Sequence, residues 1–441
     1  MALAAPPLKT FRLPWGDTEK TIDIPMDRLT AEIAFTDLPP VNDPAAAILN
    51  AMNAPIGKPP LREMIKPGDK VAVLTGDRIT DRMLGSRDGL CHVLFDYINA
   101  AGVPDKDISF VFAPGTHSPR NIDEKLGPAL INRVGRYVRH RSDLENELVY
   151  KGVTSRGTPL WMNKVVDECD VIVGFGEICP NTHGGWTGGG KMILPGVAGQ
   201  ATVEHNHRML MLPNIPLGLA DGNPLRLDME EAADMGGLDF KIDILVDSHE
   251  RMVDIYSGDF RKEHRAALPK ARQIWMTKMD PTDIAVYYPG NNRERTLESS
   301  MFVTINAADL ATKEDGIIIM CLSATDGYTL GDGLPYSATE TGRDAFKKTA
   351  EEIARDMVLY RGNTRTGSMM YASRAVMDRK KVYLVCDGID EGEAREFGFS
   401  GCFRDFDAAL NRAIEEKGSS ATISASLPMG IAWRQMPWRE G

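Results

Sequence analysis

KVAVLTG (70–76), DGLCHVLFDYINAAG (88–102) and ISFVFAPG (108–115) form the clearest structural pattern in this chain. The first and third segments are short, apolar, rich in β-branched residues and closed by glycine, which is typical of buried strands. The second carries apolar residues at near-helical spacing and has a glycine at its end. A strand, a helix and a strand in this order predict two neighbouring parallel strands joined by a right-handed crossover.

The same alternation of strand-like and helix-like segments continues along most of the chain. Further predicted strands are DVIVGFG (170–176), FKIDILV (240–246), DIAVYYPG (283–290), DGIIIMCLSA (315–324) and KVYLVCDG (381–388). Charged helices are predicted around residues 340–357 and 405–417. We therefore predict an α/β fold made of two α/β domains with mainly parallel sheets. An active-site cleft is expected between the domains, where ligands of such folds usually bind.

A chain of 441 residues is too long for one compact core, so two domains are expected. The boundary between the two domains is expected within RKEHRAALPKARQIWMTKMDPTD (261–283), where a helical pattern is followed by a connector that contains proline. We predict an N-terminal domain over residues 1–270, joined by the C-terminal segment 421–441. The C-terminal domain is predicted over residues 280–420.

Composition and charge narrow the class of protein. Hydrophobic residues make up 43% and charged residues 26% of the chain, as in ordinary soluble proteins. The net charge of −11 argues against a nucleic-acid partner, which would need a basic surface. Pro6 and Pro7 interrupt the apolar start, so we expect neither a signal peptide nor a membrane anchor. The six scattered cysteines indicate a reducing, cytoplasmic location.

GGWTGGGKMILPGVAG (184–199) places Lys191 behind a run of glycines. Gly185 to Lys191 matches the nucleotide-binding pattern G-x-x-x-x-G-K-[ST], but Met192 lacks the hydroxyl required at the last position. Pro195 stands where a phosphate-binding helix would run, and a proline inside a helix costs about 3 kcal/mol. Two other interpretations stay open. Lys191 is either a covalent anchor for a cofactor, which glycines allow to approach closely, or a solvated loop lysine.

Histidines gather around Lys191 in the sequence. His117 follows the strand 108–115, where an α/β sheet carries its catalytic loops, although a turn histidine without a role would also fit. His183 lies in the loop CPNTHGG and is expected to be exposed.

ATVEHNHRMLML (201–212) predicts a helix capped by Thr202 and carrying His205 and His207. Two residues apart on a helix, these histidines point about 200° away from each other, so they do not share one metal in the usual manner. The alternative for the pair is an H-x-H zinc site on a strand, for which no third ligand is apparent nearby. One of them is expected to face the active site.

These motifs together resemble the nickel-dependent lactate racemase family over most of the chain. GTH (115–117) is similar to the family's first catalytic-histidine motif, and GGGKMILPGVAG (188–199) to its cofactor-anchoring loop. VEHNHRM (203–209) is similar to its metal-ligand segment. FRLPWGDTEKTIDIP (11–25) resembles its N-terminal hairpin, and GNPLRLDMEEAA (222–233) the end of its first domain. The chain is identified as a divergent member of this family.

The resemblance implies a nickel-pincer nucleotide, a cofactor derived from nicotinic acid mononucleotide and covalently bound to Lys191. His207 would complete the coordination of nickel, and sulfur and imidazole donors suit that metal. The N-terminal domain would then anchor the cofactor. The other implied cofactor contacts are Asp77, Thr80, Gly188, Gly189 and Gly190. Maturation proteins that make the cofactor are implied partners.

The family's mechanism removes a proton from the hydroxyl of a 2-hydroxy acid while hydride passes from carbon to the cofactor. The resulting 2-keto acid takes the hydride back on its other face. Two bases make this reversible, and neutral histidine suits the role near pH 7. The resemblance implies that His117 is one base. The residue aligned with the second is Asn181, whose amide hydrogen-bonds but is no base. His183, two residues away, is the expected substitute.

Other positions also depart from the family. In GDRITDRML (76–84) another residue stands at the position of the family's arginine, and Arg82 follows that position by one residue. In the C-terminal domain Ser300 and Val303 stand where the family has glutamine and lysine contacts to the substrate. Arg293 and Arg295 either supply a carboxylate clamp or form a solvated turn. Asn181, Arg82, Arg293 and Arg295 are therefore the candidate substrate contacts.

We predict an isomerase, a racemase or epimerase of a 2-hydroxy acid other than lactate. One alternative is a nicotinamide-dependent dehydrogenase, which requires a G-x-G-x-x-G turn after a strand, whereas GFGEIC offers only G-x-G. The other is a non-catalytic relative that binds cofactor or ligand.

Overall fold

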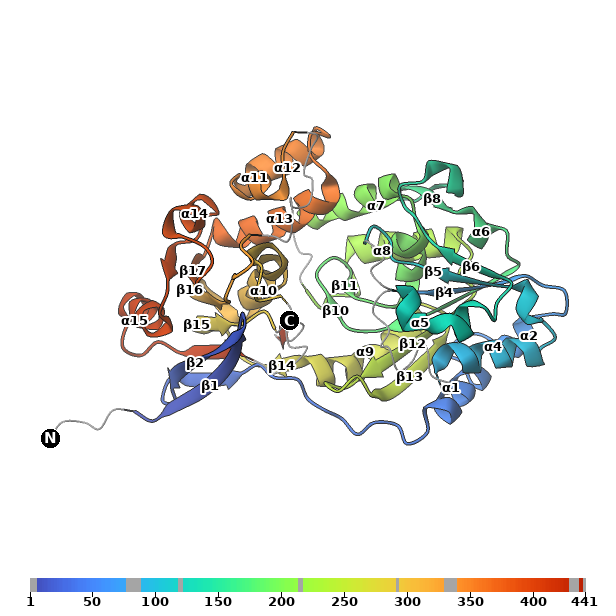
Figure 1. Ribbon diagram of the computed structural model, residues 1–441, viewed down its shortest axis with the longest axis horizontal. Helices are drawn as coiled ribbons and strands as arrows, with labels where there is room; N and C mark the ends of the chain where they lie inside the picture. Colours follow the sequence, from blue (N-terminus) through green and yellow to red (C-terminus); the bar gives the residue numbers. More distant parts are fainter. Residues whose placement is uncertain are drawn as a thin grey trace. The chain divides into compact units, whose positions relative to one another are not determined.

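The structure is a computed structural model that describes residues 6–76, 89–117, 122–212, 217–290, 293–328, 339–427 and 436–438. The chain forms two compact units (Figure 1). We call Asp37–Met209 with Asn214–Ile274 the central unit. Met1–Thr36, Leu210–Pro213 and Trp275–Gly441 form the terminal unit.

The central unit is built on a six-stranded sheet. Its strands, in spatial order, are β13 (Met252–Gly258), β12 (Phe240–Val246), β9 (Val171–Glu177), β4 (Val71–Thr75), β5 (Ile108–Phe112) and β6 (Arg136–Arg139). All neighbours are parallel except β12 and β13, which form an antiparallel pair. Burial on both faces explains why β4, β9 and β12 read as nearly continuous apolar runs in the sequence.

Helices cover both faces of this sheet (Figure 1). On one face apolar side chains of α1 (Pro44–Asn53), α2 (Leu61–Met64), α4 (Leu90–Ala100) and α5 (Ile122–Ile131) join those of the strands in one core. The remaining helices of the unit are α6 (Lys164–Asp167), α7 (Gln200–His207), α8 (Pro224–Met235) and α9 (Lys262–Trp275). Two short antiparallel hairpins, β7 (Leu148–Val153) with β8 (Pro159–Asn163) and β10 (Pro180–Asn181) with β11 (Gly185–Trp186), complete it.

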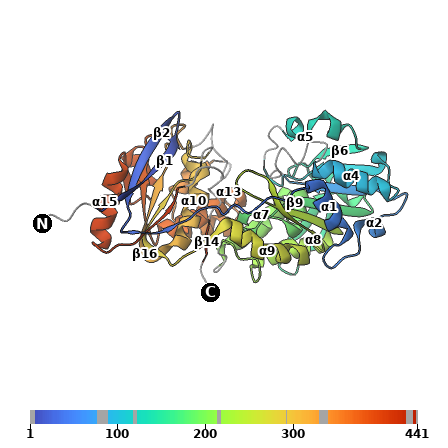
Figure 2. The same cartoon turned by 90° about the horizontal axis from the view of Figure 1, so that it is seen from below.

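The terminal unit has a six-stranded sheet of its own, parallel throughout. Its order is β18 (Gly401–Phe403), β17 (Lys381–Val385), β16 (Thr312–Cys321), β15 (Thr282–Tyr287), β19 (Ile423–Ser426) and β3 (Leu29–Glu32). The hairpin β1 (Leu8–Trp15) with β2 (Thr18–Pro25) packs with α15 (Phe406–Lys417) against this sheet (Figure 2). The other elements are α10 (Leu297–Ala311), α11 (Gly342–Phe346), α12 (Ala350–Val358), α13 (Thr364–Met377), α14 (Glu391–Glu396), β14 (Met276–Lys278) and β20 (Met436–Trp438).

The α/β prediction is confirmed, and the predicted strands lie where the sequence pattern put them. The single charged helix predicted around residues 340–357 is two helices, α11 and α12, each with its own capping threonine, Thr341 and Thr349. The assignment of residues 1–36 and 421–441 to the N-terminal domain is wrong. β3 pairs with β19, and β19 pairs with β15, so both chain ends belong to the terminal unit. The last crossing of the chain between the units lies between Ile274 and Trp275. Among the described residues, no helix has the length and apolar character needed to cross a membrane.

Candidate functional site

Lys191 lies on an irregular loop of the central unit that follows β9. The chain leaves β9 at Glu177, turns back in the β10–β11 hairpin, and forms a short 3-10 segment over Gly189–Met192. Leu194 is extended, with φ −121° and ψ 110°, so no α-helix leaves the glycines. β9 does not lead directly into a turn that could bind phosphate. The structure therefore agrees with the prediction that this is not a loop that binds nucleotide triphosphates.

Buried side chains hold this loop by its backbone. Asp243 Oδ2 accepts a hydrogen bond from Gly189 N at 2.7 Å, and His264 Nε2 donates to Thr187 O at 2.9 Å. Arg226 Nε donates to Gly184 O at 2.7 Å, and its Nη2 donates to Trp186 O. Asp243, His264 and Arg226 come from β12, α9 and α8, so three separate elements fix the loop.

The glycines before Lys191 pack against the protein itself. A Cβ on Gly188 would lie 2.6 Å from Asp243 Oδ2, and one on Gly189 would lie 3.0 Å from Phe260 O. Both have positive φ, 77° and 58°, which a larger residue would adopt only under strain. Gly190 is buried against Glu230, whose Cα would be 3.2 Å from an added Cβ. The structure therefore explains these glycines by close packing of the loop.

The residues beneath the loop form a buried charged network. Lys241 Nζ and Asp243 Oδ1 are 2.5 Å apart, and both side chains are fully buried. Burial, together with the neighbouring Asp243 charge, raises the pKa of Glu263 well above its usual range. Burial lowers the pKa of Arg226 to about 10, which leaves it charged at neutral pH. Burial, helped by the charges of Arg226 and Arg265, lowers the pKa of His264 well below its usual range, so this ring is neutral.

Asn181 connects Lys191 to the β10–β11 hairpin. Its Oδ1 accepts hydrogen bonds from Lys191 Nζ at 3.0 Å, from His183 N at 3.2 Å and from Gly184 N at 2.9 Å. Asn181 was predicted as a substrate contact. In the structure its carbonyl oxygen shapes the turn that carries His183 and orients the lysine amine.

His183 and His207 lie against each other. Their ring centroids are 4.5 Å apart at an interplanar angle of 36°, and both side chains are buried. The expectation that His183 is exposed is wrong, because Asn223 Nδ2 binds its carbonyl oxygen at 3.1 Å and α8 covers the hairpin. His205 is half-buried, as expected from its position across the helix from His207.

The cap of α7 also differs from the prediction. Gly199 is the residue before the first turn, and Thr202 lies inside the helix. The Thr202 hydroxyl donates to Pro159 O at 2.7 Å and accepts from Trp161 N at 2.9 Å, so it joins α7 to β8.

His117 lies on the loop after β5, and this loop adjoins the lysine loop. Gly115 N donates to Gly196 O at 2.9 Å, and Gly115 has a positive φ of 62°. His117 itself is exposed. The structure therefore brings the loops of His117 and Lys191 together through their backbones.

The other predicted contacts fall into two groups. Asp77, Thr80 and Arg82 lie outside the described residues. Arg293 and Arg295 lie in the terminal unit, before α10. Arg295 binds Asp326 through Nε and Nη2, both at 3.0 Å, and Asp17 through Nη1 at 2.8 Å. The guanidinium already has two carboxylate partners, so Arg295 is unsuited to a substrate clamp.

The glycines of GFGEIC do not form a dinucleotide-binding turn. Gly174 and Gly176 lie within β9, and a Cβ on Gly174 would be 2.9 Å from Met192 Cγ. These glycines make room for Met192 of the lysine loop. This packing removes the sequence basis of the dehydrogenase alternative.

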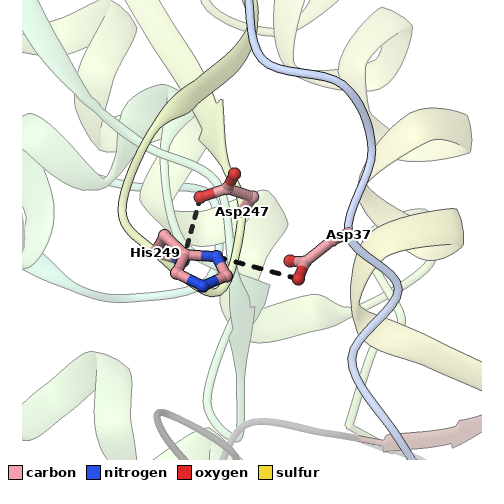
Figure 3. Close-up of side chains that lie close together, drawn as sticks. All are labelled: Asp37, Asp247 and His249. Atoms are coloured by element: carbon pink, nitrogen blue, oxygen red, sulfur yellow. Dashed lines mark hydrogen bonds and ion pairs between the residues drawn. The ribbon is translucent and has the colours of Figure 1, made fainter.

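One group of described side chains has the spacing of metal ligands: Asp37, Asp247 and His249 (Figure 3). Its carboxylates already have partners. Asp247 accepts from His249 N, Arg251 N and Arg251 Nε, and Asp37 accepts from Ser248 N and Ser248 Oγ. These bonds tie the β12–β13 turn to the segment after β3, and a structural role accounts for them.

The residues around Lys191 include groups of the kind that the implied cofactor would need. Lys191 binds Asn181 and His207 packs against His183, so both side chains contact the β10–β11 hairpin of the central unit. Imidazole is a donor that nickel accepts. The residues present therefore fit the implied cofactor. Sequence reasoning missed Asp243, Arg226 and His264, which hold the loop. The signal was present in FKIDILV, where Lys241 and Asp243 interrupt a buried strand.

Lowering the pH is expected to destabilise the central unit through His140, whose Nε2 donates to Ala198 O at the end of the lysine loop. Burial lowers the pKa of His140 to about 4, against about 6.5 in an unfolded chain. The unfolded state therefore takes up the proton first, and stability is lost as the pH falls from about 6.5 toward 4. Between about pH 7 and 5 the loss is about 2 kcal/mol. Denaturant unfolding at both pH values should show a loss smaller by this amount in His140→Gln, and equal losses would contradict the assignment.

Known proteins resemble this chain along most of its length. The family described as "Lactate racemase N-terminal domain" matches residues 15–218. A lactate racemase of Thermoanaerobacterium thermosaccharolyticum is 25% identical over 331 residues, 73% of this chain and 76% of that protein. A lactate racemase of Lactiplantibacillus plantarum is 25% identical over 301 residues, 66% of this chain and 68% of that protein.

Two solved structures share the fold. The lactate racemase apoprotein from Thermoanaerobacterium thermosaccharolyticum aligns with a TM-score of 0.80 at 21% identity, covering 98% of this chain and all of that one. The crystal structure of a protein from Thermotoga maritima aligns with a TM-score of 0.61 at 15% identity, covering 90% of this chain and 99% of that one.

Proposed function

We propose that this chain, a divergent member of the lactate racemase family, is a racemase or epimerase of a 2-hydroxy acid other than lactate. The observation that carries the proposal is the connection of Lys191, His183 and His207. Lys191 binds Asn181 in the hairpin that bears His183, and His183 packs against His207. The side chains that we propose as anchoring amine, base and metal ligand are thus connected within one part of the central unit.

We assign the covalent attachment of a nickel-pincer nucleotide to Lys191 and the coordination of its nickel to His207. When bound, this cofactor would supply an acceptor that takes a hydride from the substrate's C2 and returns it. Its maturation proteins are the proposed partners. Asp77 and Thr80 stay proposed contacts, and Gly188, Gly189 and Gly190 are proposed to let the loop lie close to both its own network and the nucleotide.

The chain's own residues would handle the proton and the carboxylate. His183 and His117 are proposed as the two bases that take the hydroxyl proton, one for each enantiomer, since neutral imidazole accepts a proton near pH 7. Arg293 and Arg82 are the proposed carboxylate contacts. Arg295 is not among the proposed contacts, because its guanidinium already pairs with Asp326 and Asp17.

The departures from the family support a substrate other than lactate. Ser300 Oγ donates to Arg293 O at 2.6 Å, so the residue aligned with a substrate-contacting glutamine stabilises the start of α10. Val303 lacks the charge of the family's lysine. A different set of side chains must therefore recognise the rest of the substrate.

The test is loss of optical purity. Protein co-produced with cofactor-maturation proteins is incubated with single enantiomers of a panel of 2-hydroxy acids, including lactate and substrates deuterated at C2. We expect racemisation of at least one acid other than lactate, with deuterium retained at C2 because hydride leaves and returns.

His207→Gln and His205→Gln form a matched pair for this test, since the two histidines lie two residues apart on α7. His207→Gln should abolish racemisation, whereas His205→Gln should keep it. Oxidation of a substrate with net reduction of a nicotinamide would favour a dehydrogenase instead. Binding of the cofactor without any turnover of the panel would favour the non-catalytic relative.

A further inference from the structure

The side chain of Asn206 has its orientation fixed by two acceptors. Asn206 Nδ2 donates to Leu225 O at 3.1 Å and to Asp228 Oδ2 at 2.8 Å. A flipped amide would place its oxygen against both of these oxygens, so the nitrogen must face them. The amide oxygen then faces His207, where Asn206 Oδ1 and His207 Nδ1 are 3.2 Å apart. Since Oδ1 only accepts, His207 Nδ1 must carry the hydrogen.

Asp228 is itself held in place by two hydroxyl groups. Thr154 Oγ1 donates to Asp228 Oδ1 at 2.5 Å, and Thr158 Oγ1 donates to Asp228 Oδ2 at 2.8 Å. Asp228 and Asn206 are both fully buried. The threonines lie in the turn between β7 and β8, and Asp228 lies on α8. A chain of hydrogen bonds therefore runs from the β7–β8 turn through α8 to the His207 ring.

We propose that Asn206 and Asp228 are positioning residues that hold His207 as its Nδ1–H tautomer, which leaves Nε2 as the atom that binds the metal. The inference rests on the proposed function for the identity of the metal ligand, whereas the tautomer follows from the hydrogen bonds alone. A ligating histidine commonly donates its other ring hydrogen to a neighbouring acceptor, which fixes the ring and strengthens the ligand.

Two other buried histidines of the same unit have the opposite tautomer. His140 Nε2 donates to Ala198 O at 2.9 Å, and Asn163 Nδ2 donates to His140 Nδ1 at 3.2 Å. His264 Nε2 donates to Thr187 O, and Arg265 Nη1 donates to its Nδ1. His140 and His207 thus each pair with an asparagine, but the amide presents its nitrogen to one and its oxygen to the other.

Ring nitrogen NMR of the full chain, labelled with 15N-histidine and free of cofactor and nickel, tests the proposal. His207 is assigned by its absence in His207→Gln, and His140 by its absence in His140→Gln. We expect the wild-type His207 ring to be protonated at Nδ1 and the His140 ring at Nε2. Protonation of wild-type His207 at Nε2 would overturn the proposal, and this measurement needs no variant at Asn206.

Asn206→Leu and Asn163→Leu are the matched variants. Asn206→Leu should remove the preference of His207 for Nδ1–H and leave His140 unchanged. Asn163→Leu should leave both tautomers unchanged, because His140 Nε2 still donates to Ala198 O. An unchanged His207 tautomer in folded Asn206→Leu would overturn the role of Asn206. In protein co-produced with the maturation proteins, Asn206→Leu should lower the affinity for nickel about 10–100-fold. Absence of nickel from the wild type would contradict the proposed function. It would not affect the His207 tautomer, which is measured on protein free of cofactor and nickel.

Discussion

Asp243→Asn is expected to lower the free energy of unfolding of the central unit by about 3–5 kcal/mol. Asp243 and Lys241 are both fully buried, with Oδ1 and Nζ 2.5 Å apart. The substitution keeps the size of the side chain and its contact to Gly189 N but removes the negative charge. Lys241 then keeps its bond to Ile242 O at 2.8 Å but loses its carboxylate partner, and removing one partner of a buried ion pair is strongly destabilising. Denaturant unfolding of wild type and variant measures the loss.

Asp143→Asn is the matched control, because it makes the same change in an exposed ion pair of the same unit. Arg141 Nη2 and Asp143 Oδ2 are 2.7 Å apart, and both side chains are about half exposed. Exposed pairs contribute little, so the unfolding midpoint should hardly move. A second control is the double variant Lys241→Met with Asp243→Asn, which removes both charges and should recover part of the loss. A loss below about 1 kcal/mol for Asp243→Asn alone would contradict the assigned role of the buried pair.

His183→Gln is expected to lower kcat/KM for racemisation by about 10²–10⁴-fold, the usual contribution of a positioned base. For a racemase the loss must be equal in the two directions, because the equilibrium constant between enantiomers is one. Polarimetry or chiral chromatography, started from each enantiomer, measures both rates.

His249→Gln is the control for this prediction. His249 is an exposed histidine of the β12–β13 turn, and its substitution should leave both rates unchanged. Rates in both directions that survive His183→Gln would show that His183 does not replace the base missing at Asn181. The reaction would then need another proton acceptor.

The sequence predicted the local elements well because their patterns are local. Each strand of the central sheet has its own run of buried apolar residues, and α4 shows helical spacing between β4 and β5. Pro195 correctly indicated that no helix follows Lys191. These features depend on neighbours a few positions apart, which a single sequence displays directly.

The same reasoning could not predict which strands pair when they lie far apart in the sequence. β3 and β19 lie at opposite ends of the chain, and nothing in either segment specifies that they pair. The burial of His183 depends on Asn223, which caps α8, and on Arg226 of α8. The shape of the lysine loop depends on Asp243 and His264. Each of these contacts joins residues that are at least 40 positions apart. The sequence signal for this network was the pair of charged residues Lys241 and Asp243 in a buried strand.

The most direct test of the central claim is the intact mass and nickel content of protein co-produced with the cofactor-maturation proteins. Lys191→Ala and Lys164→Ala, which changes an exposed lysine of α6, are measured beside the wild type. If Lys191 is the covalent anchor, the wild type and Lys164→Ala carry a nucleotide-sized mass increment and nickel, and Lys191→Ala carries no increment. Wild-type protein with neither increment nor nickel, or an increment that persists in Lys191→Ala, would contradict the account.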